Sequence, residues 1–308
     1  MSNLYIGLGG AGIDAVKAVC EKNHLKEDDC NKDKCLLVDT DICSIQDRLS
    51  STLCELEKRL DTDELLHVIV FTGSCGETGS AITLDILYML RTIMMSGVIH
   101  DIDRRNNISL LVAMPQLWIS LAGRNYDSYD PNLEYKLTAN AVAFFTELQS
   151  AIDNSDQVLF SCCCVFESNR MTKDQVSNNM AEVASVLSRV DDSDYYWGLN
   201  KSMSVASYHH LQEESFDVAA IRRCSEIVDM DLAVNHLERE KVCYMVRPDF
   251  HIPIDVLNLT NENMIGFRAN GQKGVDVLSF HSFSFKDYAF YNQYMARSDG
   301  RWAHIDKR

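Results

Sequence analysis

The sequence is poor in the features that mark fibrous, membrane-spanning and nucleic-acid-binding proteins. Only four of its 308 residues are proline, and no apolar run is long enough to cross a bilayer. A net charge of −16 argues against a general affinity for nucleic acid, because binding to a phosphate backbone requires a basic face. The N-terminal residues lack the basic region and cleavage site of a signal peptide. We therefore expect a soluble cytoplasmic protein that binds neither nucleic acid nor membrane.

The eleven cysteines raise the question of a metal site. Cys162, Cys163 and Cys164 are consecutive in the apolar segment VLFSCCCVF. Neighbouring side chains of a strand point to opposite faces, so these three cannot bind one ion. Cys30 and Cys35 have neither a second cysteine pair nor a nearby histidine to complete a zinc site. We expect reduced thiols that behave as small buried apolar side chains.

Strand and helix patterns alternate along the first half of the chain. Five apolar segments are typical of buried strands, and amphipathic helical patterns lie between them. Strands separated by helices indicate a parallel sheet with helices on both faces. The expected strands lie at 3–8, 34–39, 67–73, 108–116 and 157–166, and the expected helices lie at 13–22, 81–96 and 133–152.

A further helix is expected after the fifth strand. Thr172 and Gln175 have the spacing of a capping box, and apolar residues recur at helical intervals after them. Beyond this helix, the strand-like segments MSVASY, VCYMV and VDVLSFHSFSF mix with helical pieces. The predicted α/β architecture has a parallel-sheet domain at 1–171, a central connector helix at 172–190 and a smaller α+β domain at 191–308.

The first expected strand is followed by the glycine-rich turn GLGGAG at 7–12. Gly7, Gly9 and Gly12 satisfy the spacing G-x-G-x-x-G between a strand and a helix. Glycine lets the backbone turn tightly and approach a phosphate, and the helix N-terminus offers unpaired N–H groups. Asp39, at the end of the second strand, stands where the ribose-binding acid of an NAD-binding Rossmann domain belongs. An NAD-dependent oxidoreductase is therefore an open alternative.

A second glycine-rich turn, SCGETGSA at 74–81, follows the third expected strand and opens the next helix. Gly76 and Gly79 allow close backbone approach, and the hydroxyls of Thr78 and Ser80 can donate to phosphate oxygens. The turn is not a Walker A loop, because no G-K-S/T occurs. Two such turns on neighbouring strands indicate a polyphosphate bound from two sides, and hence a nucleoside triphosphate.

The two turns resemble the nucleotide-binding motifs of the tubulin/FtsZ superfamily. The first is similar to the FtsZ motif IGVGGGGGNAV, with Asp14 where Asn is usual, and LLVDTD at 36–41 is similar to the segment AVNTD. The second resembles the tubulin signature S/A/G-G-G-T-G-S/A-G, with Cys75 at the first position, Glu77 for the second glycine and Ala81 for the last. A carboxylate at Glu77 repels a triphosphate unless Mg²⁺ lies between them or the side chain turns outward.

Two later segments fit the same resemblance. LAGRNYD at 121–127 is similar to the family's EGRKR loop, with Arg124 as a phosphate or ribose contact. VDDSD at 190–194 is similar to the acidic V/L-D-x-x-D loop of phage and plasmid tubulins. In the family this loop enters the nucleotide pocket of the next subunit, and its carboxylates polarise the water that attacks the γ-phosphate. The resemblance therefore implies that Asp191 and Asp194 are catalytic.

The resemblance, greatest to the PhuZ/TubZ-like phage and plasmid tubulins, implies a GTPase that binds GTP or GDP with Mg²⁺. It would polymerise head to tail with itself in the cytoplasm, which is that of the host if a phage encodes it. Asn169 and Asn178 are candidates for guanine contacts, although Asn is also common at helix starts. A non-hydrolysing filament protein and a monomeric regulatory GTPase stay open as alternatives. The other implied nucleotide-binding residues are Gly9, Gly10, Ala11, Gly12, Asp14, Asp39, Gly76, Glu77, Thr78, Gly79, Ser80 and Arg124.

Overall fold

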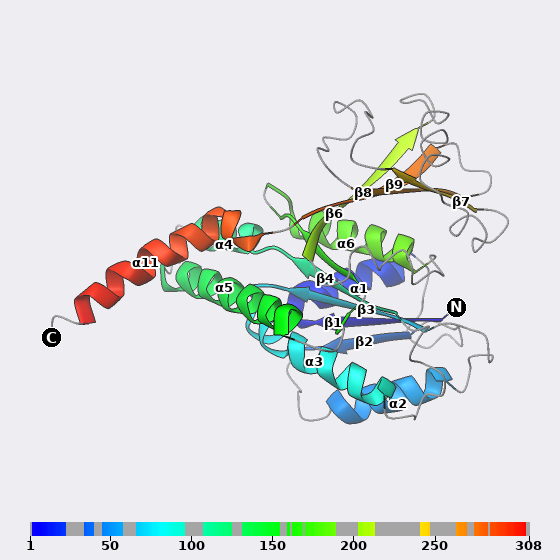
Figure 1. Ribbon diagram of the computed structural model, residues 1–308, viewed down its shortest axis with the longest axis horizontal. Coiled ribbons are helices and arrows are strands. Elements are labelled where there is room, and N and C mark those ends of the chain that lie inside the picture. The colour runs from blue at the N-terminus through cyan, green and yellow to red at the C-terminus, as the bar shows by residue number, and fades with distance from the viewer. Residues whose placement is uncertain are drawn as a thin grey trace.

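The structure, a computed structural model, describes fourteen segments of the chain. Within them one sheet of nine strands runs in the order β2-β1-β3-β4-β5-β6-β9-β8-β7 (Figure 1). The described segments are 2–22, 34–39, 45–57, 66–95, 107–124, 131–154, 159–160, 162–168, 170–188, 203–212, 241–246, 263–269, 274–282 and 284–305.

The first five strands form the parallel part of the sheet. The central β1 (Ser2–Leu8) pairs with β2 (Lys34–Val38) on one side and with β3 (Leu66–Gly73) on the other. β4 (Asn107–Ala113) and β5 (Cys162–Phe166) continue the ladder beyond β3 in the same direction. This confirms the predicted parallel sheet. The carboxyl ends of all five strands consequently share one edge.

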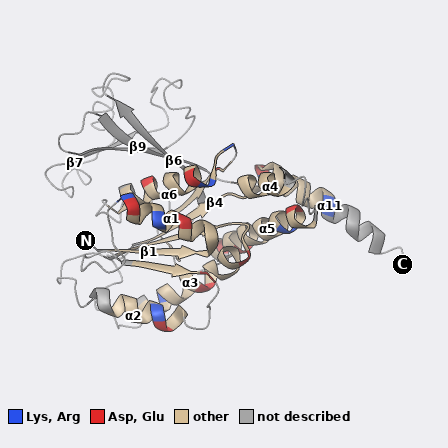
Figure 2. Ribbon diagram, turned by 180° about the vertical axis from the view of Figure 1, so that it is seen from behind, with Lys and Arg blue, Asp and Glu red and all other residues tan. Residues whose placement is uncertain are grey.

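Helices cover both faces of the parallel part (Figure 1). α1 (Gly9–Lys22) and α6 (Lys173–Leu187) lie side by side on one face. α2 (Ile45–Glu57), α3 (Glu77–Met95) and α5 (Pro131–Asn154) cover the other. Figure 2 shows that the charged residues of the described segments lie mainly on these helices, while β1, β3 and β4 carry none. Each face therefore buries an apolar core between strands and helices.

The pleat of β5 separates its consecutive cysteines, as predicted. Cys163 packs in the core under α3 and α5, whereas Cys164 packs in the core under α1 and α6. Both thiols are buried. Across the described segments, no three His, Cys, Asp or Glu side chains are grouped so that they could hold a metal ion.

The sheet continues beyond the connector helix. β6 (Met203–Gln212) pairs in parallel with β5, and then antiparallel with β9 (Gly274–Ser282). β8 (Asn263–Ala269) and β7 (Lys241–Val246) complete the sheet with antiparallel pairings. A parallel part followed by antiparallel strands agrees with the predicted fold class. The domain boundaries at 171 and 190 stay predictions.

Two further helices flank the carboxyl edge of the parallel strands. α4 (Gln116–Arg124) follows β4, and α11 (Ala289–Ile305) packs on α5 and extends away from the sheet (Figure 1). The rings of Tyr135 and Tyr294 stack with centroids 5.7 Å apart, which joins α5 to α11. Among the described residues, no helix has the length and apolar character needed to span a membrane.

Candidate nucleotide-binding site

The first glycine-rich turn forms the start of α1. Gly9 has a φ of 65°, a left-handed conformation that favours glycine. A Cβ on Gly9 would lie 2.8 Å from the backbone nitrogen of Gly79, so the two predicted turns contact each other through their backbones. A Cβ on Gly12 would lie 2.2 Å from the carbonyl oxygen of Phe71, so a glycine is required where α1 crosses β3. Close contacts within the protein therefore explain the spacing of these glycines, independently of any ligand.

The second turn is fixed to its surroundings by hydrogen bonds. Ser74 donates to the carbonyl oxygen of Ala113 from its backbone nitrogen at 3.0 Å and from its hydroxyl at 2.8 Å. Thr83 Oγ1 donates to the carbonyl oxygen of Gly79 at 2.6 Å, inside the first turns of α3. Cys75 is buried, and this burial raises the pKa of its thiol to about 12. The turn is thus rigid and Cys75 serves as an apolar residue.

Two glycines of the turns face open space. A Cβ on Gly10 or on Gly76 would meet no heavy atom within 4 Å, and both residues are exposed. They lie at the N-terminal ends of α1 and α3, where the first backbone N–H groups of a helix have no intrahelical partner. Such groups, with the positive end of the helix dipole, form a site for phosphate. The two helix N-termini therefore lie open at one edge of the sheet.

Glu77 points toward α5. Its carboxylate forms an ion pair with the ammonium of Lys136, which lowers the pKa of Glu77 through their hydrogen bond and charge interaction. Asn140, one helical turn after Lys136, donates from Nδ2 to the carbonyl oxygen of Cys75 at 3.2 Å. The carboxylate that departs from the tubulin signature is therefore balanced by a cation.

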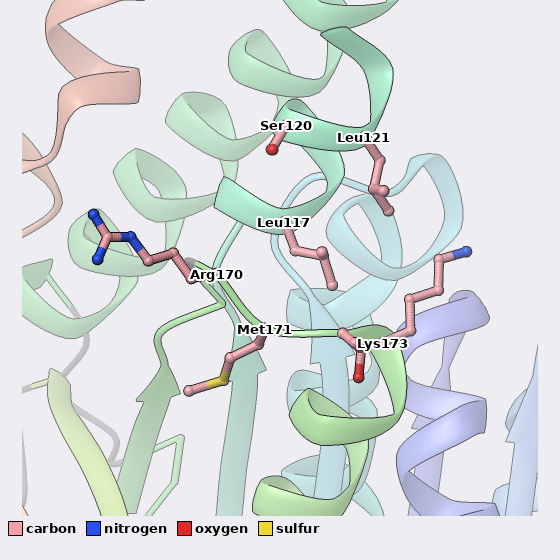
Figure 3. Close-up of a pocket in the computed structure, with 7 residues that line it drawn as sticks. Leu117, Ser120, Leu121, Arg170, Met171 and Lys173 are labelled. Atoms are coloured by element: carbon pink, nitrogen blue, oxygen red, sulfur yellow. The ribbon is translucent and has the colours of Figure 1, made fainter. Parts of the chain in front are cut away.

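A cavity of about 400 Å³ opens between α4 and the turn that connects β5 to α6 (Figure 3). Ser168 joins the segment after β5 to the segment that leads from β4 into α4. Its hydroxyl donates to the carbonyl oxygen of Met114 at 2.7 Å and accepts from the backbone nitrogen of Leu117 at 2.9 Å. The cavity has an apolar wall, and Arg170 and Lys173 lie at its rim, with the guanidinium of Arg170 pointing away from α4 (Figure 3). It is lined by Leu117, Ser120, Leu121, Arg170, Met171, Thr172 and Lys173.

The turn at the base of the cavity has a defined geometry. Arg170 has a φ of 60°, which is uncommon for a residue with a side chain. The predicted capping box of α6 is confirmed, since the backbone nitrogen of Thr172 donates to Gln175 Oε1 at 2.8 Å and that of Gln175 donates to Thr172 Oγ1 at 3.2 Å. The start of α6 is therefore fixed beside the cavity.

The cavity lies at the same edge of the sheet as the glycine-rich turns, because all three follow the carboxyl ends of parallel strands. α1 and α6 lie side by side, and an ion pair joins Lys22 to Glu182. Lys22 is thirteen residues after Gly9 and Glu182 is nine after Lys173, so the first turn of α6 lies beside the early turns of α1.

The remaining predicted residues have different outcomes. Asp39 directly follows β2 and is exposed at the same edge, and Asp14 and Asn178 are exposed on α1 and α6. Arg124 is the last residue of α4, and its side chain is not among those described. Asn169, Asp191 and Asp194 lie outside the described residues.

Sequence reasoning missed four residues of this edge: Arg170 and Lys173 at the cavity, and Lys136 and Asn140 at the second turn. Arg170 lies just before the capping box and Lys173 lies within it, which gave a signal for their position. No sequence signal pairs Lys136 with Glu77, because they lie 59 positions apart and meet only through the packing of α5 on α3.

A parallel α/β sheet with glycine-rich turns on two neighbouring strands defines a tubulin-type nucleotide-binding fold. A family model described as "Tubulin like" matches residues 34–183, just under half of the chain. Together with the fold, this match confirms the resemblance to the tubulin/FtsZ superfamily that the motifs predict.

A solved structure of TubZ shares the fold, and two others align less closely. GDP-form protofilaments of TubZ from Bacillus thuringiensis serovar israelensis align with a TM-score of 0.50 at 11% identity, over 99% of this chain and 92% of that chain. The GTPγS-form protofilament of the same protein aligns with a TM-score of 0.49 at 11% identity, over 99% and 94%. A TubZ of type III plasmid segregation aligns with a TM-score of 0.47 at 11% identity, over 100% and 94%. A comparison with curated protein sequences gives no match.

Proposed function

We propose that this chain binds GTP or GDP at the edge formed by its two glycine-rich turns. The observation that carries this proposal is the backbone contact between Gly9 and Gly79, which brings the N-termini of α1 and α3 to one place. An NAD-binding Rossmann domain uses one such turn, whereas a triphosphate can use both. The second turn therefore favours a nucleoside triphosphate over NAD.

The edge has a place for each part of the nucleotide. The phosphates would bind the first turns of α1 and α3, beside the open positions of Gly10 and Gly76. The base would enter the neighbouring cavity, whose volume of about 400 Å³ is in the usual range for small-molecule sites. Asn169 and Asn178 would contact guanine, and Arg124 and Asp39 would lie toward the ribose or phosphates. Mg²⁺ would be held by the phosphates and by oxygens from Thr78, Ser80 or Asp39, and would offset their negative charge.

We further propose that the protein polymerises head to tail into filaments. The TubZ with a similar fold is described as forming protofilaments in a GDP form, which supports assembly as a function of this fold. In the arrangement implied by the motifs, the segment at 190–194 of one subunit completes the site of the next. Asp191 and Asp194 would orient the attacking water, because a carboxylate accepts hydrogen bonds from it. Hydrolysis would then require a heterologous contact between subunits.

A concentration series tests this dependence on assembly. GTP turnover per subunit should rise with protein concentration and follow the sedimented fraction. Turnover that is constant per subunit from a dilute, non-sedimenting chain would indicate a monomeric GTPase instead.

Variants of the acidic segment test the catalytic assignment. Asp194→Ala should leave GTP binding intact, slow hydrolysis by roughly two orders of magnitude and lengthen filament lifetime. Asp192→Ala in the same segment is the matched control, because the D-x-x-D pattern does not include it. Equal turnover in both variants and the unsubstituted protein would remove Asp194 from the mechanism.

Nucleotide specificity is tested by sedimentation with GTP, GDP, a slowly hydrolysed GTP analogue and NAD, with phosphate release measured in parallel. Assembly with GTP or its analogue, and phosphate release with GTP alone, is the expected result. Filaments without phosphate release would indicate a non-hydrolysing polymer. Binding of NAD without assembly would indicate the oxidoreductase alternative.

A further inference from the structure

Two cysteines from different elements are in contact at the end of α1 distant from the glycine-rich turn. Cys20 lies near the end of α1, and Cys35 lies at the amino end of β2 beside Tyr5 of β1. Their Sγ atoms are 3.0 Å apart. Both side chains are partly exposed and pack against the edge of the core beneath α1 and α6. The pair is therefore both preorganised and accessible to small reagents.

This arrangement distinguishes the pair from the other described cysteines. Cys163 and Cys164 are buried on opposite faces of the sheet, and Cys75 is buried inside the second turn. Cys54 is partly exposed but lies on α2, which covers the opposite face from α1.

We propose that Cys20 and Cys35 are a redox modification site, where a small-molecule disulfide converts the two thiols into a reversible bond. A disulfide requires an S–S distance of about 2.05 Å, so the sulfurs must approach by about 1 Å, which rotation of the two side chains can supply.

The chemistry is a two-step exchange with oxidised glutathione as the oxidant. The thiolate of one cysteine attacks a sulfur of the glutathione disulfide, whose S–S bond breaks and releases one glutathione thiolate. The second cysteine, as its thiolate, attacks the protein sulfur of the mixed disulfide and releases the second glutathione. Two protein thiols lose two protons and two electrons, and one glutathione disulfide becomes two thiols. Excess reduced glutathione reverses both steps.

The bond would join α1 to β2 without entering the nucleotide edge. Cys20 lies eleven residues after Gly9, about 16 Å along the helix. The cross-link would close the chain from 20 to 35 into a loop and reduce the freedom of the unfolded state. We therefore expect a higher thermal midpoint in the oxidised protein, with nucleotide affinity unchanged.

The test uses the full-length protein in glutathione buffers of increasing oxidised fraction, with free thiols then blocked by N-ethylmaleimide. Peptide mass spectrometry should find Cys20 linked to Cys35, and fragmentation must separate Cys35 from Cys43, which shares its tryptic peptide. The thermal midpoint should rise by roughly 5 °C on oxidation. Dithiothreitol should reverse both changes.

Three single variants provide the controls. Cys20→Ser and Cys35→Ser should lose the cross-link and the rise in midpoint, while Cys54→Ser should keep both. The proposal fails if Cys20 and Cys35 are alkylated as completely as Cys54 after oxidation. It also fails if the linked peptide forms but the midpoint rises equally in Cys20→Ser. Neither outcome bears on nucleotide binding, which is measured separately.

Discussion

The backbones of Gly9 and Gly79 lie so close that a methyl group on Gly9 would stand 2.8 Å from the nitrogen of Gly79. A Cβ on Gly79 would in turn lie 2.8 Å from the carbonyl oxygen of Leu8. The two turns can therefore pack this closely only because neither residue has a side chain. This mutual packing aligns the starts of α1 and α3 at one edge, which a single glycine-rich turn could not do.

Glycine substitutions should separate this structural role from ligand binding. Gly9→Ala places a side chain at φ 65° and against Gly79, so we expect a loss of about 1–3 kcal/mol in the free energy of unfolding. Gly10→Ala meets no protein atom and should leave that free energy unchanged or slightly higher. It should still weaken GTP binding roughly tenfold, because the methyl group enters the proposed phosphate space. Urea unfolding and equilibrium GTP binding on both variants check this, and normal GTP affinity in Gly10→Ala would contradict the site.

The ion pair between Glu77 and Lys136 should matter for affinity through charge. Lys136→Met leaves an unbalanced carboxylate at the start of α3, where the proposed phosphates bind. We expect GTP affinity to fall roughly two- to fivefold, a modest change because both side chains are exposed. Glu77→Gln combined with Lys136→Met should restore affinity toward that of the unsubstituted protein.

Lys17→Met, on the exposed side of α1, is the matched control for loss of one positive charge. Calorimetry at low and high salt should show the Lys136→Met effect shrinking as salt screens the charges. If the double variant binds as weakly as Lys136→Met alone, Glu77 is not the source of the repulsion.

The position of Arg170 permits a test in which stability and function change in opposite directions. Its φ of 60° is costly for a residue with a side chain, so Arg170→Gly should raise the free energy of unfolding by about 1 kcal/mol. The same change removes a cation from the rim of the cavity proposed for the base. GTP affinity should therefore fall in a more stable protein, as measured by titration and urea unfolding together. A more stable variant with unchanged affinity would show that Arg170 only forms the turn.

The parallel sheet was predictable because its strands are continuous apolar runs with one glycine-rich turn or helix after each. Their ends were less predictable. The fourth expected strand extends to residue 116, but β4 ends at Ala113, since Pro115 has no N–H to continue the ladder. The fifth begins only at Cys162, and the carbonyl oxygen of Leu159 ahead of it accepts a hydrogen bond from Arg91 Nε at 3.0 Å.

Some elements were missed for different reasons. α2 has a readable pattern, with Ile45, Leu49 and Leu53 buried at four-residue intervals. α4, α11 and β8 were not predicted either. At the site, sequence indicated the glycine-rich turns and the α6 cap, but the Lys136 pairing of Glu77 depends on how α5 packs against α3.

The last prediction concerns pH and a buried histidine distant from the nucleotide edge. His67, the second residue of β3, is fully buried, with Nε2 2.9 Å from Ser109 Oγ on β4. Burial lowers the pKa of His67 from 6.5 to about 4. The unfolded chain therefore binds a proton at a higher pH than the folded protein does. The contribution to stability is complete above pH 6.5 and is lost as the pH falls toward about 4.

This loss should amount to about 1.4 kcal/mol per pH unit, on the order of 3 kcal/mol in total. His67→Gln cannot titrate in this range, so its free energy of unfolding should decline less steeply between pH 6.5 and 4.5 than that of the unsubstituted protein. Urea unfolding of both proteins at matched pH measures the difference, and the carboxylates common to both cancel from it. The variant should be less stable at pH 7, because the buried glutamine amide still has polar groups that need hydrogen-bond partners. As the pH falls, the free energies of unfolding of the two proteins should converge. If the two pH profiles run parallel, the protonation of His67 does not differ between the folded and unfolded states in this range, and the prediction is wrong.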